Sequence, residues 1–249
     1  MTAWGVTLPI TTPGICCCGS PTEEVAMCMI DKHREYSVPP RRSRMLAVAS
    51  LLALGVGALG WARADAPDPA TQAFAQRLAI GVCGTCHGPH GNSGQPKFPR
   101  LAGQSGNYLV AQLKNFRGQT RGDPDAIGYM WGMAAELDDP TIEALAKYYS
   151  SQQPLRGRTG DPALAARGRE IYEHGIESEG VPACSSCHGA DGHGVADFPR
   201  LASQRSQYIL KQLASFQSNM RNVAVMHGVA QNLRTNEMQA VAAYLEGQP

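Results

Sequence analysis

The feature that most constrains this chain is a five-residue motif that occurs twice. The pattern C-x-x-C-H stands at residues 83–87 and again at residues 184–188. Two thiols three positions apart can form two thioether bonds to one porphyrin, and the adjoining imidazole can supply a nitrogen to its iron. Each copy therefore predicts one covalently bound haem c. The predicted attachment and ligand residues are Cys83, Cys86 and His87 in the first copy, and Cys184, Cys187 and His188 in the second.

Two other chemistries use a C-x-x-C pair and stay open as alternatives. Zinc knuckles and thioredoxin-like redox sites both contain it. The immediate His in both copies favours haem over either of them. The other four of the eight cysteines all precede residue 29, ahead of a predicted export signal, so none remains for a disulfide in the exported chain. We expect the two covalently bound haems to stabilise the exported chain in place of disulfides.

An export signal is predicted within residues 41–64. Three arginines at 41–44 precede an apolar run from Met45 to Trp61, and the run ends in a small-x-small site closed by Ala64. This order is typical of a secretory signal peptide, and we expect cleavage after Ala64 and delivery to the periplasm. The alternative is an uncleaved anchor, for which a run of 17 residues lies at the short limit.

Charge argues against a nucleic-acid partner. After Ala64 the chain holds 16 Lys and Arg against 17 Asp and Glu, so its formal charge is near zero even before haem propionates are counted. A nucleic-acid-binding domain would instead present a basic stripe. Docking of a partner protein through a local patch, or peripheral association with a membrane, is left open by the net charge.

The chain after the signal is an internal repeat of two helical halves. Residues 98–102 read F-P-R-L-A and recur at 198–202, and the segments that follow align without a gap. Apolar residues recur at helical spacing in each half, and strand signals are absent from both. We expect an all-α fold. Its predicted divisions are residues 1–64 as upstream extension and signal, 65–152 as domain 1, 153–160 as a linker and 161–249 as domain 2.

Two methionines occupy equivalent places in the repeat and are candidate sixth ligands. Met130 stands seven residues before Leu137, and Met226 stands seven before Leu233. Most methionines simply pack in a core, and that interpretation applies best to Met133 and Met220, which have no counterpart in the other half. The repeat favours Met130 and Met226 as thioether ligands.

These motifs together resemble the dihaem cytochrome c4 family, over nearly the whole chain from about Ala70 to Leu245. The resemblance rests on the tandem C-x-x-C-H, the F-P-R-L-A-x-Q segments, the Y-L-x-x-Q-L helix and its counterpart at residues 208–213, and the M-x-x-x-A-x-x-L closing segments. It implies two tandem class I cytochrome c domains related by a pseudo-twofold axis, with His/Met ligation of both irons. It also implies that the carbonyl oxygens of Pro99 and Pro199 accept the ring N–H of the axial His. Arg100 and Arg200 could pair with haem propionates or be helix-surface residues.

The resemblance implies an electron carrier and not an enzyme. Family members are periplasmic and deliver electrons toward a terminal oxidase, which predicts protein redox partners on the quinol-oxidising side and at the oxidase. A six-coordinate His/Met iron has no open position for a substrate. Such an iron suits outer-sphere electron transfer, in which no ligand of the iron is exchanged. Two alternatives are the dihaem subunit of a periplasmic dehydrogenase, similar to a flavocytochrome, and a dihaem peroxidase, which would need one open or bis-His haem.

Overall fold

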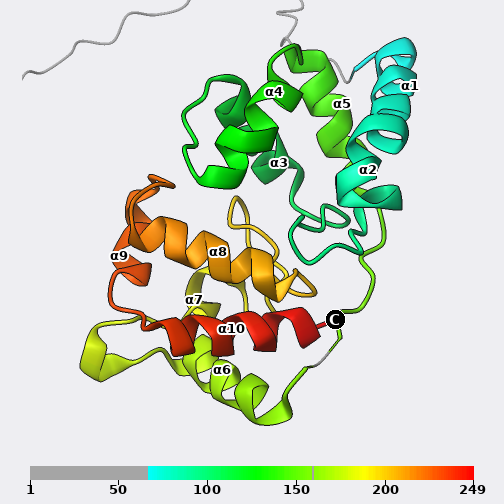
Figure 1. The fold of residues 1–249 in the computed structure, drawn as a ribbon. Helices are drawn as coiled ribbons and strands as arrows, with labels where there is room; N and C mark the ends of the chain where they lie inside the picture. The colour runs from blue at the N-terminus through cyan, green and yellow to red at the C-terminus, as the bar shows by residue number, and fades with distance from the viewer. Residues whose placement is uncertain (1–66, 159) are drawn as a thin grey trace, which may run out of the picture. The chain divides into compact units, whose positions relative to one another are not determined.

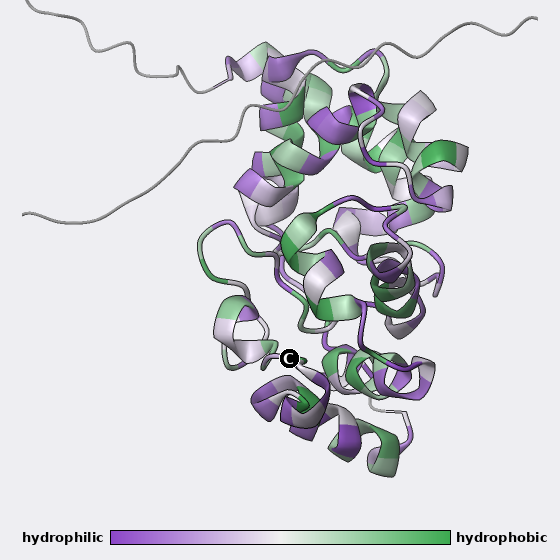
Figure 2. Cartoon of the chain, turned by 90° about the vertical axis from the view of Figure 1, so that its left-hand side faces the viewer, coloured by the Kyte–Doolittle hydropathy of each residue, from purple (hydrophilic) through white to green (hydrophobic). Residues whose placement is uncertain are grey.

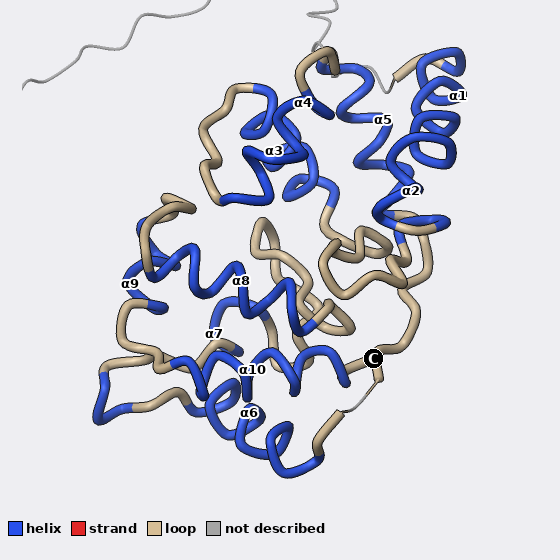
Figure 3. Tube along the Cα trace, viewed as in Figure 1, coloured by secondary structure: helices blue, strands red, loops and turns tan. Residues whose placement is uncertain are grey.

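The computed structural model describes residues 67–158 and 160–249 (Figures 1 and 3). The predicted signal segment lies outside the described residues. Within them the secondary structure is helical, apart from one isolated bridge between Ile176 and Val181. The longer α-helices are α1 (Pro69–Leu78), α3 (Gly106–Arg117), α5 (Asp139–Ser150), α6 (Pro162–His174), α8 (Ser206–Gln217) and α10 (Thr235–Gly247). The shorter ones are α2 (Gly84–His87), α4 (Trp131–Ala134), α7 (Ser185–His188) and α9 (Ala224–Ala230).

The first half is a bundle in which α1 and α3 pack on α5. Its core joins Ala75 of α1, Leu109 of α3 and Leu145 of α5, and all three side chains are buried. A smaller cluster around Phe116 lies where α3 meets α4. The apolar residues of this half divide between the core and the surface, because Phe74 and Ile80, which also lie near helical spacing, are 46% and 54% exposed.

The second half repeats this arrangement with α6, α8 and α10. Tyr172 of α6, Ile209 of α8 and Leu245 of α10 meet in one buried cluster. Green and purple residues alternate along the helices of both halves in Figure 2, as amphipathic helices require. In the described part of the chain, no helix is both long and apolar enough to span a membrane.

Aspartate caps start three of these helices. The carboxylates of Asp68, Asp138 and Asp161 accept backbone N–H bonds from the first turns of α1, α5 and α6, and each is followed by proline in the first turn. The start of α10 uses a different device. There Glu237 Oε2 accepts from the N–H of Arg234, 2.9 Å away, so the third helical residue closes the cap.

The two halves differ in how they approach their C-x-x-C-H motifs. In the first half the chain runs from α1 through a π-helical turn, Ala79–Cys83, directly into α2. In the second half α6 ends at Gly175, and a loop carrying the Ile176–Val181 bridge intervenes before Cys184. Helical periodicity predicted helices in both halves, but it predicted neither the π turn nor the loop.

The crossing of α6 and α10 depends on Gly168. A Cβ placed there would lie 1.9 Å from the carbonyl oxygen of Ala240, so the helices approach more closely than any side chain allows. The residue at the corresponding place in α1 is Ala75, which is fully buried.

We expect Gly168→Ala to destabilise the second half by about 1–3 kcal/mol, because the added methyl group must push α10 away. Urea unfolding of the haem-loaded protein, followed by circular dichroism, measures the change. Gly160→Ala is the control, since no atom lies within 4 Å of a Cβ at that position. Equal stability of the two variants would mean that α6 and α10 do not cross as described.

Buried polar side chains join the two halves. Arg121 donates to Gln112 of its own half at 2.8 Å and to Gln212 of the other at 2.7 Å. Arg221 mirrors it, donating to Gln212 at 2.7 Å and to Gln112 at 2.9 Å. Asp123, which is 1% exposed, binds Arg121 Nε at 2.6 Å. This reciprocal pattern is what a local twofold axis between tandem repeats produces.

The segment between the halves packs against the first of them. Asn92 donates to the carbonyl of Gln153 at 3.0 Å and accepts from the N–H of Leu155 at 2.8 Å. The predicted linker, residues 153–160, has no helical periodicity in its sequence, and its described residues lie outside the helices. The Asn92 bonds fix its first residues in place.

Candidate haem-binding sites

Each C-x-x-C-H motif folds as a single helical turn that ends at its histidine. The turns are α2 and α7, and each is followed by a glycine with positive φ, 77° at Gly88 and 83° at Gly189. A Cβ at Gly88 would lie 2.5 Å from the carbonyl oxygen of Asn92, so the chain can turn away only without a side chain. Because i and i+3 share one face of a helical turn, the two cysteines of each motif lie on the same side.

Both histidines are buried and oriented by a proline carbonyl. His87 Nδ1 lies 2.9 Å from the Pro99 oxygen, and His188 Nδ1 lies 3.1 Å from the Pro199 oxygen. A carbonyl can only accept, so the proton is on Nδ1 and the lone pair on Nε2 is free for a ligand bond. Burial lowers the pKa of both rings, which keeps them neutral at pH 7. A neutral, oriented imidazole is what iron ligation needs.

The four cysteines are free in the structure. Burial raises the pKa of the Cys83 thiol, and it raises the pKa of Cys184 to about 11. Thiols of this kind are poor thiolate nucleophiles, which argues against a thiol redox site. Among the residues described, no group of three or more His, Cys, Asp or Glu side chains is placed to hold a metal ion.

Exposed apolar side chains surround the motifs. The ring of Phe98 meets the His87 ring edge-on with centroids 6.2 Å apart, and it also meets the Tyr129 ring edge-on at 5.8 Å. Phe198 repeats the first contact with His188 at 5.9 Å. Large apolar side chains that are at least 39% exposed lie near the motifs or the candidate methionines in sequence: Ile80, Val82, Ile127, Tyr129, Val195, Phe198, Val223 and Val225. A porphyrin, with two apolar faces, fits this set of side chains.

The candidate methionines lie in equivalent, half-buried positions. Met130 ends a π-helical turn (Ala126–Met130) and packs beside Phe116, and Met226 lies in α9 against the core of the second half. The residue that follows each methionine forms a hydrogen bond with a backbone carbonyl of the helix before it or of the turn after that helix. Trp131 Nε1 donates to the Arg121 carbonyl at 2.8 Å, and His227 Nδ1 is 2.8 Å from the Phe216 carbonyl. These two hydrogen bonds hold the segments that carry Met130 and Met226 in place.

The two arginines after the prolines share one unusual property. The Nε atoms of Arg100 and Arg200 are buried without a hydrogen-bond partner among the described residues. Arg100 Nη1 donates to the Ser203 carbonyl at 2.6 Å, and Arg200 Nη2 donates to the Pro249 carbonyl at 2.8 Å. Both residues lie outside the helices, so the interpretation as helix-surface residues does not hold. An unpartnered guanidinium N–H suits an anionic group such as a haem propionate.

The sequence analysis missed two residues that contact the proline segments. Gln204 binds both backbone groups of Arg100: its Oε1 accepts from the N–H at 2.7 Å, and its Nε2 donates to the carbonyl at 2.9 Å. Gln104 makes the same pair of bonds with Arg200, at 2.8 and 2.9 Å. The signal for them was present, because both are the glutamine of the repeated F-P-R-L-A-x-Q segment.

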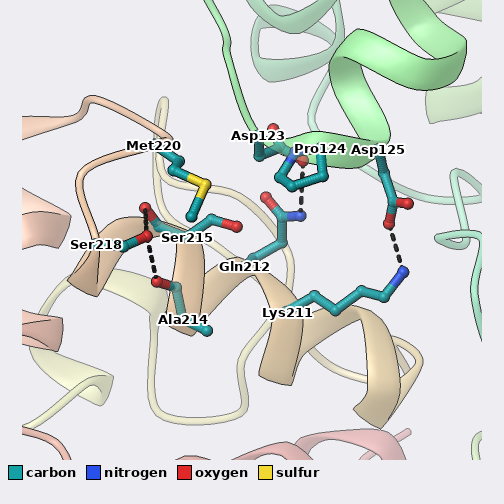
Figure 4. A pocket seen from close by; sticks show the side chains of 9 residues that line it. All are labelled: Asp123, Pro124, Asp125, Lys211, Gln212, Ala214, Ser215, Ser218 and Met220. Atoms are coloured by element: carbon teal, nitrogen blue, oxygen red, sulfur yellow. Dashed lines mark hydrogen bonds and ion pairs between the residues drawn. The ribbon is translucent and has the colours of Figure 1, made fainter.

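A pocket of about 270 Å³ also lies where the segment from Asp123 to Asp125 meets α8 (Figure 4). Its polar groups satisfy one another: Lys211 pairs with Asp125 at 2.5 Å, and Gln212 donates to Asp123 at 3.3 Å. The lining contains none of the predicted haem residues.

Comparison with known proteins agrees with this geometry. The profile of the cytochrome c family matches twice, at residues 72–153 and 165–248. Cytochrome c-552 of Acidithiobacillus ferridurans is 40% identical over 82% of this chain and 86% of its own length. Cytochrome c4 of Stutzerimonas stutzeri is 38% identical over 80% of this chain and 97% of its own.

A further relative and a solved structure extend the comparison. The thiosulfate dehydrogenase electron acceptor of Thiomonas intermedia is 37% identical over 85% of this chain and 93% of its own length. The crystal structure of reduced recombinant cytochrome c4 from Pseudomonas stutzeri superposes with a TM-score of 0.64 at 36% identity, covering 74% of this chain and 99% of that one.

Proposed function

Because this chain belongs to the dihaem cytochrome c4 family, we propose that it carries electrons from the quinol-oxidising side of a respiratory chain to a terminal oxidase. The cytochrome c domain occurs twice, and the chain accordingly binds two haem c groups covalently and acts as an electron carrier, not as an enzyme. Its partners are redox proteins. When bound, the two irons supply reversible one-electron chemistry.

We propose the following residue roles, each supported by the geometry of its motif. Cys83 and Cys86 would hold one haem and Cys184 and Cys187 the other, because each pair shares one side of a helical turn. His87 and His188 would supply Nε2 to the irons, oriented by Pro99 and Pro199. Met130 and Met226 would supply the sixth ligands, and Arg100 and Arg200 would each direct their unpartnered Nε to a propionate.

The single observation that carries this proposal is the state of the two histidines. Each is buried, neutral and bonded through Nδ1 to a carbonyl, so that only Nε2 is available, and each follows two free cysteines. A periplasmic location is typical of the family. We propose that residues 41–64 direct export and are removed after Ala64, and that any membrane association of the exported protein is peripheral.

A haem count tests the proposal directly. We expect the purified protein to give two haems per chain in a pyridine haemochrome assay and to show the near-infrared band of Met-ligated ferric haem. Cys184→Ala with Cys187→Ala should leave one haem, still attached through Cys83 and Cys86. Two haems in that double variant, or sharp haem bands absent from the native protein, would contradict the assignment.

A second candidate function follows from the relative that is named as an electron acceptor. On this view the chain accepts electrons from a periplasmic dehydrogenase and works as its bound partner. Reduction of the purified protein by thiosulfate together with such a dehydrogenase, at a rate above that with a quinol-oxidising complex, would favour it. Turnover of hydrogen peroxide with a reduced donor would instead favour the peroxidase alternative.

A further inference from the structure

One peptide group in each half is bonded at both ends, once to the histidine of its own half and once to the other half. The carbonyl of Pro99 accepts from His87 Nδ1 at 2.9 Å, and the N–H of the same peptide group, on Arg100, donates to Gln204 Oε1 at 2.7 Å. His87 and Gln204 belong to different halves. They are joined through a single planar, resonance-stabilised unit.

The second half contains the mirror image of this connection. His188 Nδ1 lies 3.1 Å from the Pro199 carbonyl, and the N–H of Arg200 donates to Gln104 Oε1 at 2.8 Å. The same chain of bonds thus occurs twice, with the donor and acceptor halves exchanged.

We propose that Gln104 and Gln204 are positioning residues that tune the axial histidine of the opposite half, so that the reduction potential of each haem is set partly by a side chain of the other domain. This rests on the proposed ligand roles of His87 and His188.

The glutamine side chains are held firmly enough for this task. Both are buried, at 6% exposure each. Each Nε2 donates to the carbonyl of the arginine that its Oε1 binds, at 2.9 Å in both halves. Each Oε1 also accepts the N–H of the residue that follows the glutamine, at 2.9 Å from Ser105 and 3.0 Å from Arg205. Two backbone donors at Oε1 and one carbonyl acceptor at Nε2 fix the orientation of each amide.

The direction of the effect follows from how hydrogen bonds polarise a peptide group. When Gln204 accepts a hydrogen bond from the Arg100 N–H, electron density in that peptide group shifts toward the Pro99 oxygen. The oxygen then accepts more strongly from His87 Nδ1. A stronger bond at Nδ1 makes the imidazole a better donor at Nε2. Greater donation favours the ferric state, so each glutamine lowers the potential of the opposite haem.

A structural role alone would predict something different. If the glutamines served only to join the halves, their loss would weaken the interface and change the potentials of both haems alike. Gln112 provides a matched comparison, because its Oε1 also accepts across the interface, from Arg221 at 2.9 Å, but bonds to neither proline peptide group. Gln112→Met therefore removes a cross-half bond without touching the connection to a histidine.

The test uses the haem-loaded protein and two readouts for Gln204→Met and Gln104→Met. We expect Gln204→Met to raise only the potential of the first haem, changing its oxidised-to-reduced ratio up to tenfold, about 59 mV for a one-electron couple. The Nδ1–H proton resonance of His87 in the reduced protein should move upfield, while that of His188 stays in place. Gln104→Met should do the reverse, and Gln112→Met should move neither resonance selectively.

Gln204→Glu decides the matter should the Met variants fail to fold, since it keeps the acceptor oxygen and adds negative charge, while giving up the bond from Nε2 to the Arg100 carbonyl. It should move the His87 resonance downfield and leave that of His188 in place. A shift confined to the same half as the substitution, or equal shifts in both halves, would overturn the inference. Failure of the proposed function is distinguishable, because it would appear in the unmodified protein as a haem count other than two.

Discussion

Replacing Met226 by alanine should lower the reduction potential of the second haem by on the order of 0.2 V, within the roughly 0.8 V range that axial ligands span. A thioether favours ferrous iron, and alanine offers no ligand in its place. Met130→Ala should do the same to the first haem. The near-infrared band of Met-ligated ferric haem should fall to half its native intensity in either variant and vanish in the double variant.

The methionines without a counterpart in the repeat supply the controls. Met133 is 47% exposed and Met220 is 52% exposed. Met133→Ala and Met220→Ala should retain both potentials and the full near-infrared band. If Met133→Ala lost half of the band and Met130→Ala retained it, the ligand in the first half would be Met133, and the alignment of the two closing segments would be wrong.

The repeat explains why so much of this fold was predictable. Apolar residues at helical spacing predicted helices in both halves, and the structure has helices in both. The family comparison confirms the tandem cytochrome c domains and the two haems. Two copies of a pattern give each assignment an internal check, because a residue that matters in one half recurs in the other.

What the sequence could not supply lies mainly between the halves. Gln104 and Gln204 recur in the repeat, but recurrence alone does not say that each pairs with the opposite half. Arg121 and Arg221 recur as well, whereas Asp123 has no equivalent and only the structure brings it to the interface. Contacts between segments about a hundred residues apart leave no periodicity, so a one-dimensional pattern cannot reveal them.

The largest effect on stability is expected at the buried ion pair of Asp123 and Arg121. Both side chains are buried, at 1% and 7% exposure, and their atoms Oδ2 and Nε are 2.6 Å apart. Arg221 is buried in the same network, through the shared Gln112 and Gln212. Asp123→Asn would leave two buried guanidinium groups without a counter-charge, which should cost about 3–5 kcal/mol in the free energy of unfolding.

This pair also predicts how stability depends on pH. Burial opposes the charge of Asp123, but Arg121 and the bond from Gln212 outweigh it and lower the pKa of the carboxyl below its usual 3.8. A lowered pKa in the folded state means that the stabilisation is complete above about pH 4 and is lost as the pH falls through the folded value. The native protein should therefore lose stability below pH 4 more steeply than Asp123→Asn does.

Asp139→Asn is the matched control, because Asp139 also has two cationic partners, Lys114 at 2.8 Å and Arg117 at 2.6 Å, yet its side chain is 50% exposed. Solvent screens that cluster, so its loss should change stability little. Urea unfolding of the haem-loaded proteins at pH 7 and at pH 3.5 separates the two cases. Similar unfolding midpoints for the two variants at pH 7 would mean that Asp123 is solvated, and that the halves are not joined through a buried charge.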